Sequence, residues 1–137
     1  MISVTTTWQS DMAFDAQIGG HHVVMDAAAE FGGKESGPRP KPLLLAALGG
    51  CTGMDVVSLL KKMRVEYRAF RILAKGETSD EHPKVFTKIH LIYEFEGRGL
   101  PLDKLKKAVD LSQERYCSVS AMLREASELT YEVRTVN

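Results

Sequence analysis

The sequence lacks an excess of either charge. Its 137 residues include 18 lysines and arginines and 18 aspartates and glutamates, so the formal net charge at pH 7 is zero. A chain without a global positive field has nothing that attracts polyanions or an anionic membrane surface. We therefore expect neither nucleic acid nor a membrane among its partners.

Cysteine is scarce, and neither of the two cysteines belongs to a short motif. Cys51 and Cys117 lie 66 positions apart with no CxxC pair, which argues against a thioredoxin motif and a cysteine zinc site. The N-terminal segment MISVTTTWQSD lacks the basic start and apolar run of a signal peptide, so we expect a cytoplasmic protein. In that reducing compartment the two cysteines can act together only if folding brings them together.

Metal-binding and phosphate-binding motifs are absent as well. The sequence has no HExxH, no phosphate loop and no GxSxG. His21 and His22 are neighbours on a predicted strand, where adjacent side chains point to opposite faces. His82 falls in a predicted turn and His90 on the solvent face of a strand. We expect neither a metal nor another cofactor.

The N-terminal region predicts three short strands. Apolar and polar side chains alternate from Ile2 to Gln9 and again from Met12 to Ile18. Gly19-Gly20 is a hairpin signal, and the run from His21 to Met25 completes a three-stranded meander. The segment from Phe31 to Pro42 is rich in glycine and proline, so it is predicted to be a loop.

A long apolar helix is predicted from Pro42 to about Met63. Its most apolar part, Leu43 to Leu60, has about the length of a short membrane span, but small and polar residues interrupt it: Gly49, Gly50, Thr52, Asp55 and Ser58. We therefore interpret it as a buried helix. Such a helix must be covered on every side. Since a small sheet covers only one side, we expect a second subunit to cover the rest.

Three more strands are predicted in the second half of the chain, from Arg68 to Lys75, from Val85 to Glu96 and from Leu129 to Val136. The residues from Thr78 to Pro83 form a turn between the first two. In the strand from Val85 to Glu96, apolar side chains alternate with charged and polar ones, which is typical of a sheet with one wet face.

Two further helices are predicted between the last two strands. Pro101 opens an amphipathic helix that ends near Tyr116, with an inner stripe of Leu102, Leu105, Ala108 or Val109, and Ser112. Ser118 is expected to cap a short second helix. The predicted order is β-β-β-α-β-β-α-α-β, and no repeat or linker divides it. We predict one α+β domain over residues 1–137.

Cys51 lies near the middle of the long helix, among Gly49, Gly50 and Gly53. Each interior glycine costs a helix about 0.5 to 1 kcal/mol relative to alanine, so this cluster needs a reason. Missing side chains allow either close packing of another helix or access to the thiol. Taken alone, a cysteine in an apolar helix is more often an inert core residue than a nucleophile.

Cys117 directly precedes the predicted cap Ser118, where free backbone N–H groups can stabilise a thiolate. Arg115 is two residues away; it could lower the pKa of this thiol further or simply face solvent. Asp55 follows Cys51 by one helical turn. It could orient a partner, but we favour a buried or interface salt bridge.

Two blocks of sequence carry a resemblance to a known family. The segment PLLLAALGGCTGMDVV, from Pro42 to Val57, and the segment RYCSV, from Arg115 to Val119, resemble the cysteine blocks of the OsmC/Ohr family. More narrowly, the chain is similar to the YhfA-like branch of that family. Lesser features also match, namely His22, Asp26, Gly32-Gly33, His82-Pro83 and Leu111-Ser112. The resemblance covers nearly the whole chain and implies an intertwined homodimer with central helices packed across the interface.

The resemblance also implies a chemistry, namely thiol-dependent reduction of organic peroxides or hydrogen peroxide without metal or haem. Cys51 would attack the O–O bond and become a sulfenic acid, and Cys117 would condense with it to a disulfide. A small dithiol or a lipoyl-bearing protein would then restore both thiols by exchange.

One departure from the family pattern concerns activation of the thiolate. The peroxidase branches have a glutamate shortly before the first cysteine and an N-terminal arginine paired with it. Here the nearest equivalents of the glutamate are Lys41 and Pro42, and no arginine precedes Arg39. The candidates for replacing this pair are Arg39, Glu35, Glu30 and Arg115.

Two other functions stay open at the level of sequence. One is a non-catalytic stress protein, or hydrophobic-ligand-binding protein, that uses an apolar cavity of the same dimeric fold. The other gives both cysteines a purely structural, reduced role. An enzyme needs a depressed pKa at Cys51, whereas a binding protein needs only a pocket.

Overall fold

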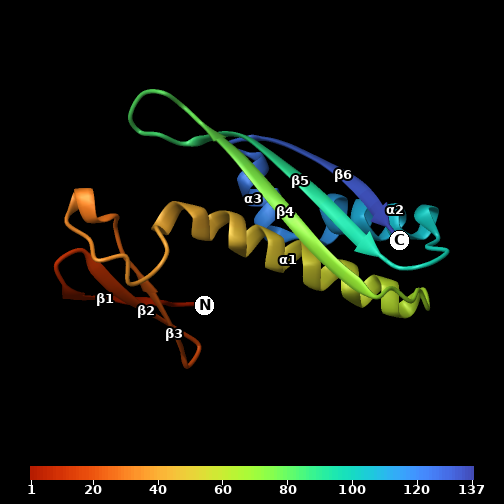
Figure 1. The fold of residues 1–137 in the computed structure, drawn as a ribbon, viewed down its shortest axis with the longest axis horizontal. Helices are drawn as coiled ribbons and strands as arrows, with labels where there is room; N and C mark the ends of the chain where they lie inside the picture. Colours follow the sequence, from red (N-terminus) through yellow and green to blue (C-terminus); the bar gives the residue numbers. More distant parts are fainter. The chain divides into compact units, whose positions relative to one another are not determined.

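The computed structural model of the chain describes residues 1–137. Its elements follow the predicted order β-β-β-α-β-β-α-α-β, with an added 3-10 turn at Ala29–Phe31 and a π-turn at Ser112–Tyr116 (Figure 1). The prediction of an α+β fold is confirmed. The residues pack into two compact units, Met1–Leu44 and Leu45–Asn137, which we describe separately. That the chain is one domain stays a prediction.

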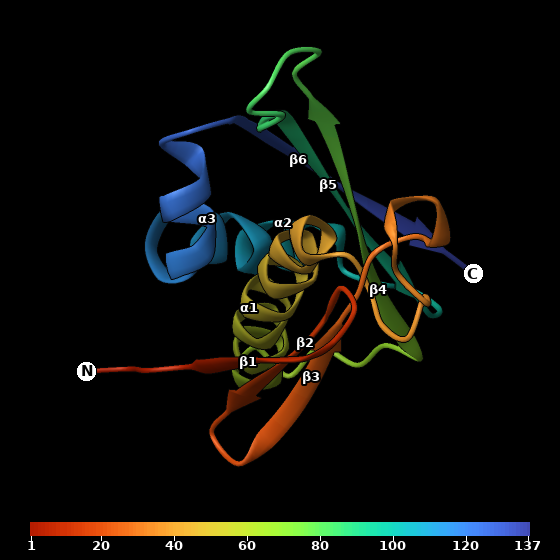
Figure 2. The ribbon, with the colours of Figure 1, turned by 90° about the vertical axis from the view of Figure 1, so that its left-hand side faces the viewer.

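The first unit holds the predicted meander of three antiparallel strands, β1 (Thr5–Ser10), β2 (Ala13–Ile18) and β3 (His21–Met25) (Figure 2). Gly19 and Gly20 form the β2–β3 turn with positive φ angles of 52° and 84°, which glycine adopts without strain. β1 begins later than predicted. The register pairs Thr5 with Gln17, near the end of β2, so the preceding residues extend beyond the paired region.

A single carboxylate organises the loop that follows β3. Asp26 Oδ2 accepts hydrogen bonds from the Ser36 hydroxyl at 2.6 Å and from the Ser36 and Lys34 N–H groups at 3.1 Å, and Oδ1 accepts one from the Ala27 N–H at 2.7 Å. These donors, first among them the Ser36 hydroxyl, hold the pKa of Asp26 far below its usual range. The hydrogen bonds to this carboxylate thus fix a loop that contains no helix or strand.

The long helix α1 (Pro40–Lys62) begins two residues before the predicted start, because a second proline, Pro40, also suits a first helical turn. One stripe of α1 is fully buried: Leu48, Thr52, Val56 and Leu60. The opposite side stays exposed within the chain, with Met54 at 76% of its accessible area. By length and composition alone α1 could also span a membrane, but core helices of soluble proteins meet the same test.

The second unit is built on a three-stranded sheet in the order β4-β5-β6, formed by Ala69–Thr78, Phe86–Glu96 and Glu128–Val136. β4 and β5 are an antiparallel hairpin, whereas β6 runs parallel to β5. The predicted alternation of β5 is confirmed, since Ile89, Leu91, Tyr93 and Phe95 are buried. Figures 1 and 2 show α1, α2 (Leu102–Leu111) and α3 (Ser118–Arg124) on one side of this sheet.

Two details of the predicted helices are wrong. Leu102 is exposed rather than part of the inner stripe, because it is the first residue of α2 and precedes the turns that contact the core. The stripe begins at Leu105 and continues through Ala108, Val109 and Ser112. Ser118 does not cap α3. The capping residue is Cys117, whose sulfur accepts a hydrogen bond from the Ser120 N–H at 3.3 Å.

Candidate functional site

Cys51 lies beside the buried stripe of α1, half-buried and packed against the core. The glycines near it are not required by packing inside this unit. Apart from its chain neighbours and the backbone of its own helix, a Cβ atom on Gly49 or Gly50 would meet nothing within 4 Å, and one on Gly53 would meet only the tip of Ile72 at 3.3 Å. Of the two reasons considered for the glycines, close packing within the unit is therefore excluded for Gly49 and Gly50. They leave open space beside the helix.

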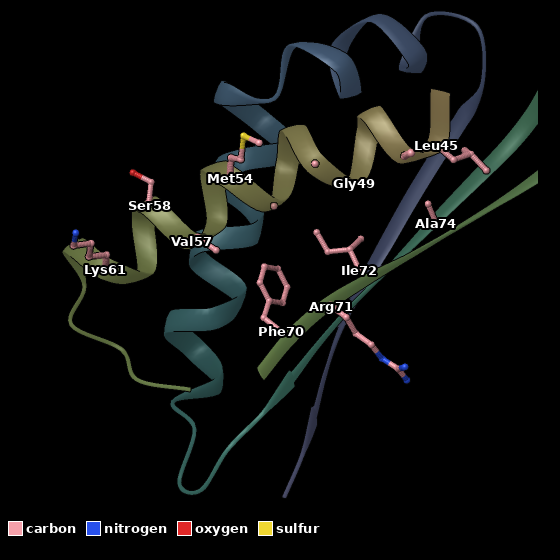
Figure 3. A pocket seen from close by; sticks show the side chains of 13 residues that line it. Leu45, Gly49, Met54, Val57, Ser58, Lys61, Phe70, Arg71, Ile72 and Ala74 are labelled. Atoms are coloured by element: carbon pink, nitrogen blue, oxygen red, sulfur yellow. The ribbon is translucent and has the colours of Figure 1, made fainter. Parts of the chain in front are cut away.

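That open space is a groove of about 890 Å³ between α1 and β4. Figure 3 shows Phe70 and Ile72 of β4 facing α1 across it, while Arg71 points away. Most of the groove wall is apolar; its lining comprises Leu45, Ala46, Gly49, Gly50, Gly53, Met54, Val57, Ser58, Lys61, Phe70, Arg71, Ile72 and Ala74. The sequence did not predict where this groove lies, nor that β4 forms one of its walls.

The fold brings the two cysteines together. Cys117 is buried at the start of α3, and its thiol lies near enough to the Cys51 sulfur to act as a donor that lowers the pKa of Cys51. The Cys51 Sγ also lies 4.0 Å from the Ser118 Oγ. Both cysteines are free thiols. The structure therefore contains a dithiol pair, assembled from the middle of α1 and the first turn of α3.

The two thiols differ in acidity. Burial acts to raise the pKa of Cys51, but hydrogen bonds from the Val119 N–H, the Cys117 thiol and the Ser118 hydroxyl outweigh it, so the net pKa is lowered. The pKa of Cys117 is raised, chiefly by burial and further by the neighbouring Cys51, against hydrogen bonds from Ser120. Cys51 is thus the more acidic of the two thiols.

Asp55 opposes the ionisation of Cys51 because its charge raises the pKa of that thiol. Its Oδ2 accepts a hydrogen bond from the Ser112 hydroxyl at 2.9 Å, and an interface salt bridge stays a prediction. We expect Asp55→Asn to keep this acceptor, lose the charge and lower the pKa of Cys51. At a pH below the midpoint of thiolate formation, alkylation of Cys51 by iodoacetamide should be about threefold faster.

The control for this measurement is Asp110→Asn, which changes another carboxylate of the same unit that accepts a hydrogen bond, from the Tyr131 hydroxyl at 2.7 Å. Its alkylation profile should match that of the parent protein. A midpoint that stays in place or moves to higher pH in Asp55→Asn contradicts the electrostatic role of Asp55.

None of the residues predicted to activate Cys51 is among the donors that lower its pKa. Glu35 and Arg39 belong to the first unit and form an ion pair of 2.5 Å with each other. Arg115 is exposed, with its guanidinium 5.7 Å from the centre of the Tyr116 ring. Glu30 lies in the 3-10 turn. Their roles stay predictions, and the named donors that lower the pKa of Cys51 are neutral groups of Cys117, Ser118 and Val119.

A buried polar cluster next to the dithiol was not predicted. Thr52, Tyr93, Ser112 and Gln113 are almost completely buried, yet their polar side chains bond to one another. The sequence places Ser112 on the inner stripe of its helix and among the family features, but it predicts no partner for the hydroxyl. A usable signal was present, because Thr52 and Ser112 occupy inner positions of two amphipathic helices, where a polar side chain requires a partner.

Two of the four histidines form ordinary side-chain pairs. His22 contacts Asp15 at 2.8 Å in the first unit, and His90 contacts Thr130 at 2.7 Å and Glu132 at 3.0 Å in the second. Residues 1–137 contain no group of three or more histidine, cysteine, aspartate or glutamate side chains that could hold a metal ion.

Comparison with known proteins places this dithiol in a family. Residues 32–132 match the family described as OsmC-like protein. The chain is 37% identical over 117 residues to protein YhfA of Escherichia coli K12, covering 85% of this chain and 84% of that protein. It is similar to the crystal structure of a hypothetical protein from Aquifex aeolicus VF5, with a TM-score of 0.83 and 31% identity over 100% of this chain and 98% of the other.

A more distant structure shares the fold alone. The organic hydroperoxide resistance protein OhrB of Bacillus subtilis has a TM-score of 0.62 and 19% identity, with 96% of this chain and 98% of that chain covered. The matched segment 32–132 includes both cysteines, the groove and the polar cluster. On the family match and the identity to YhfA, the chain belongs to the OsmC-like protein family.

Proposed function

We propose that the protein reduces organic hydroperoxides, or hydrogen peroxide, through a two-cysteine cycle in the cytoplasm. The observation that supports this most directly is the pair of adjacent thiols with opposite pKa shifts, lowered at Cys51 and raised at Cys117. A nucleophile needs the thiolate form, and a resolving thiol is useful only after the first sulfur has been oxidised. The fold shared with an organic hydroperoxide resistance protein agrees with this function.

The proposed cycle uses the two thiols, a peroxide as oxidant and an external dithiol as reductant. The Cys51 thiolate attacks one peroxide oxygen, the O–O bond breaks, and the leaving alkoxide takes up a proton to become an alcohol. Cys51 is then a sulfenic acid. The Cys117 sulfur attacks it, a disulfide forms, and the hydroxyl leaves with the thiol proton as water. A small dithiol or a lipoyl-bearing protein then reduces the disulfide by exchange.

The first experiment mixes the reduced protein with a modest excess of an alkyl hydroperoxide and follows its intact mass. We expect the loss of two hydrogens within seconds to minutes, together with the loss of both titratable thiols. Incubation with a dithiol should restore the starting mass. Persistence of both thiols through minutes of exposure would refute the peroxidase function.

We also propose that the protein acts as a homodimer through the exposed side of α1. Met54 and Val57 are exposed apolar side chains beside Gly50, whose missing side chain leaves space for a second helix. The first unit likewise exposes apolar side chains, among them Trp8 and Phe14. Apolar surface on a long helix and on a small sheet is what a second copy would bury.

Sedimentation analysis should therefore give about twice the 15.2 kDa mass of the chain. Met54→Glu should weaken the dimer by about 2 to 3 kcal/mol, since it places a charge in an apolar contact. The same exchange at Met122, an exposed methionine outside the groove lining, is the control. A monomeric parent protein, or equal weakening by both exchanges, argues against this interface.

The groove supports an alternative, non-catalytic function. Its volume of about 890 Å³ and mostly apolar wall suit a hydrophobic ligand. On this alternative, an apolar fluorescent probe should bind equally well to the parent and to Cys51→Ser, and the thiols should stay inert to peroxide. Gly50→Leu, which fills space beside the helix, should then abolish probe binding.

A further inference from the structure

The buried polar cluster forms the middle of a continuous chain of hydrogen bonds between an exposed cation, Arg124, and a half-buried anion, Asp55. Six residues form it, in the order Arg124, Gln113, Tyr93, Thr52, Ser112 and Asp55; we call it the donor chain. Its links are Arg124 to the Gln113 Oε1 at 3.0 Å, the Gln113 Nε2 to the Tyr93 hydroxyl at 2.7 Å, and the Tyr93 hydroxyl to the Thr52 Oγ1 at 2.6 Å. Two more complete it, from Thr52 to the Ser112 Oγ at 2.7 Å and from Ser112 to the Asp55 Oδ2 at 2.9 Å.

The direction of every link follows from counting protons. A carboxylate oxygen accepts hydrogen bonds. Ser112 therefore donates its single hydroxyl proton to Asp55 and must accept the hydrogen bond from Thr52. Because Thr52 donates its own hydroxyl proton to Ser112, it must accept the hydrogen bond from the Tyr93 hydroxyl. Tyr93 in turn accepts from the amide of Gln113. All donors therefore point from Arg124 towards Asp55, an arrangement in which each bond polarises the next.

The donor chain ties together the two segments that carry the thiols. Thr52 directly follows Cys51 on α1. Ser112 and Gln113 begin the π-turn, and the Cys117 N–H closes that turn by donating to the Ser112 carbonyl at 2.8 Å. Because Ser112 and Gln113 are held by their side chains and Cys117 by its backbone, the place of the Cys117 sulfur relative to Cys51 depends on these hydrogen bonds.

We propose that the donor chain is a set of positioning residues that holds the Cys117 thiol against Cys51 for disulfide closure. This role rests on the dithiol site of the proposed function. In closure, the Cys117 sulfur bonds to the sulfur of the oxidised Cys51, and the hydroxyl on Cys51 leaves with the Cys117 proton as water. Removing one hydroxyl leaves a buried partner unpaired and loosens the π-turn, so closure suffers even where both sulfurs are intact. A π-turn at the start of the segment bearing a reactive cysteine suits such a role.

The test measures closure without peroxide, by equilibrating the protein with mixtures of reduced and oxidised glutathione. One oxidised glutathione takes up the two electrons of the dithiol and gives two reduced molecules. Thr52→Val, Tyr93→Phe and Ser112→Ala each remove one link with little change of shape. We expect the equilibrium constant for the Cys51–Cys117 disulfide to fall about tenfold in at least two of them, because the effective concentration of one thiol at the other drops.

Ser127→Ala is the matched control, since it removes a buried hydroxyl of the same unit that donates to the Phe86 carbonyl at 2.6 Å, outside the donor chain. Its equilibrium constant should stay within twofold of the parent value. Equal constants in the three variants and the parent overturn the proposal, as does an equal fall in Ser127→Ala or a parent that forms no disulfide. A parent that closes with glutathione but ignores peroxide overturns the proposed function alone.

Discussion

Cys51→Ser should reduce the rate of hydroperoxide consumption at pH 7 by at least about a thousandfold, to the background of the dithiol reductant. The reason lies in the difference between the two thiols. Cys51 is half-exposed and its pKa is lowered by three neutral donors, whereas Cys117 is buried and its pKa is raised. Cys117 therefore supplies almost no thiolate to replace the missing nucleophile. The measurement is peroxide consumption in the presence of excess dithiol.

The pH dependence of peroxide consumption by the parent protein gives an independent check on the same sulfur. A thiol with a lowered pKa is ionised from a lower pH upward, so the rate should rise with pH and level off below the ordinary pKa of a cysteine. A rate that still climbs steeply above that pKa would assign the reaction to an unactivated thiol. Residual turnover of Cys51→Ser above a tenth of the parent rate contradicts the assignment of the nucleophile.

The parts of the fold that local rules govern could be predicted from the sequence. Gly19-Gly20 predicts a tight turn between β2 and β3, since both residues need a positive φ. The alternation in β5 predicts a strand with one buried face, which Leu91 and Tyr93 occupy. Each of these signals lies within a few residues of the feature it predicts.

The features that depend on residues distant in the sequence could not be predicted. The three neutral donors to Cys51 come from Cys117, Ser118 and Val119, and only the packing of α3 against α1 brings them to it. A cysteine as the capping residue runs against the usual preference for serine, so Ser118 was the natural prediction. The donor chain joins residues up to 72 positions apart, from Thr52 to Arg124.

The role of the glycines around Cys51 could be predicted only in part. The sequence shows that they cost helix stability but leaves the reason open. The structure limits the answer, since Gly49 and Gly50 border open space in the groove rather than a tightly packed neighbour. Their contribution is thus to the surface that a second copy or an apolar molecule would contact, and local sequence rules contain no information about such a partner.

Cys117→Ser should leave the first reaction of Cys51 with peroxide intact, but the sulfenic acid formed on Cys51 should no longer be protected from further oxidation. Serine can take over the cap of α3, because its oxygen can accept the hydrogen bond that the Ser120 N–H gives to the Cys117 sulfur. The fold should therefore survive the exchange. Without a resolving thiol, however, the sulfenic acid at Cys51 persists and reacts with further peroxide to the sulfinic acid, which the dithiol cannot reduce.

The expected result is a gain of one oxygen in intact mass at a single equivalent of peroxide, trapped by a sulfenic-acid probe only in this variant. At about ten equivalents a second oxygen should appear and activity should be lost irreversibly, whereas the parent protein recovers on reduction. Cys51→Ser, treated in parallel, should gain no oxygen, because its remaining thiol is buried and protonated. If Cys117→Ser instead recovers fully after repeated exposure, Cys117 is not the resolving residue, and an external thiol must reach the oxidised Cys51 directly.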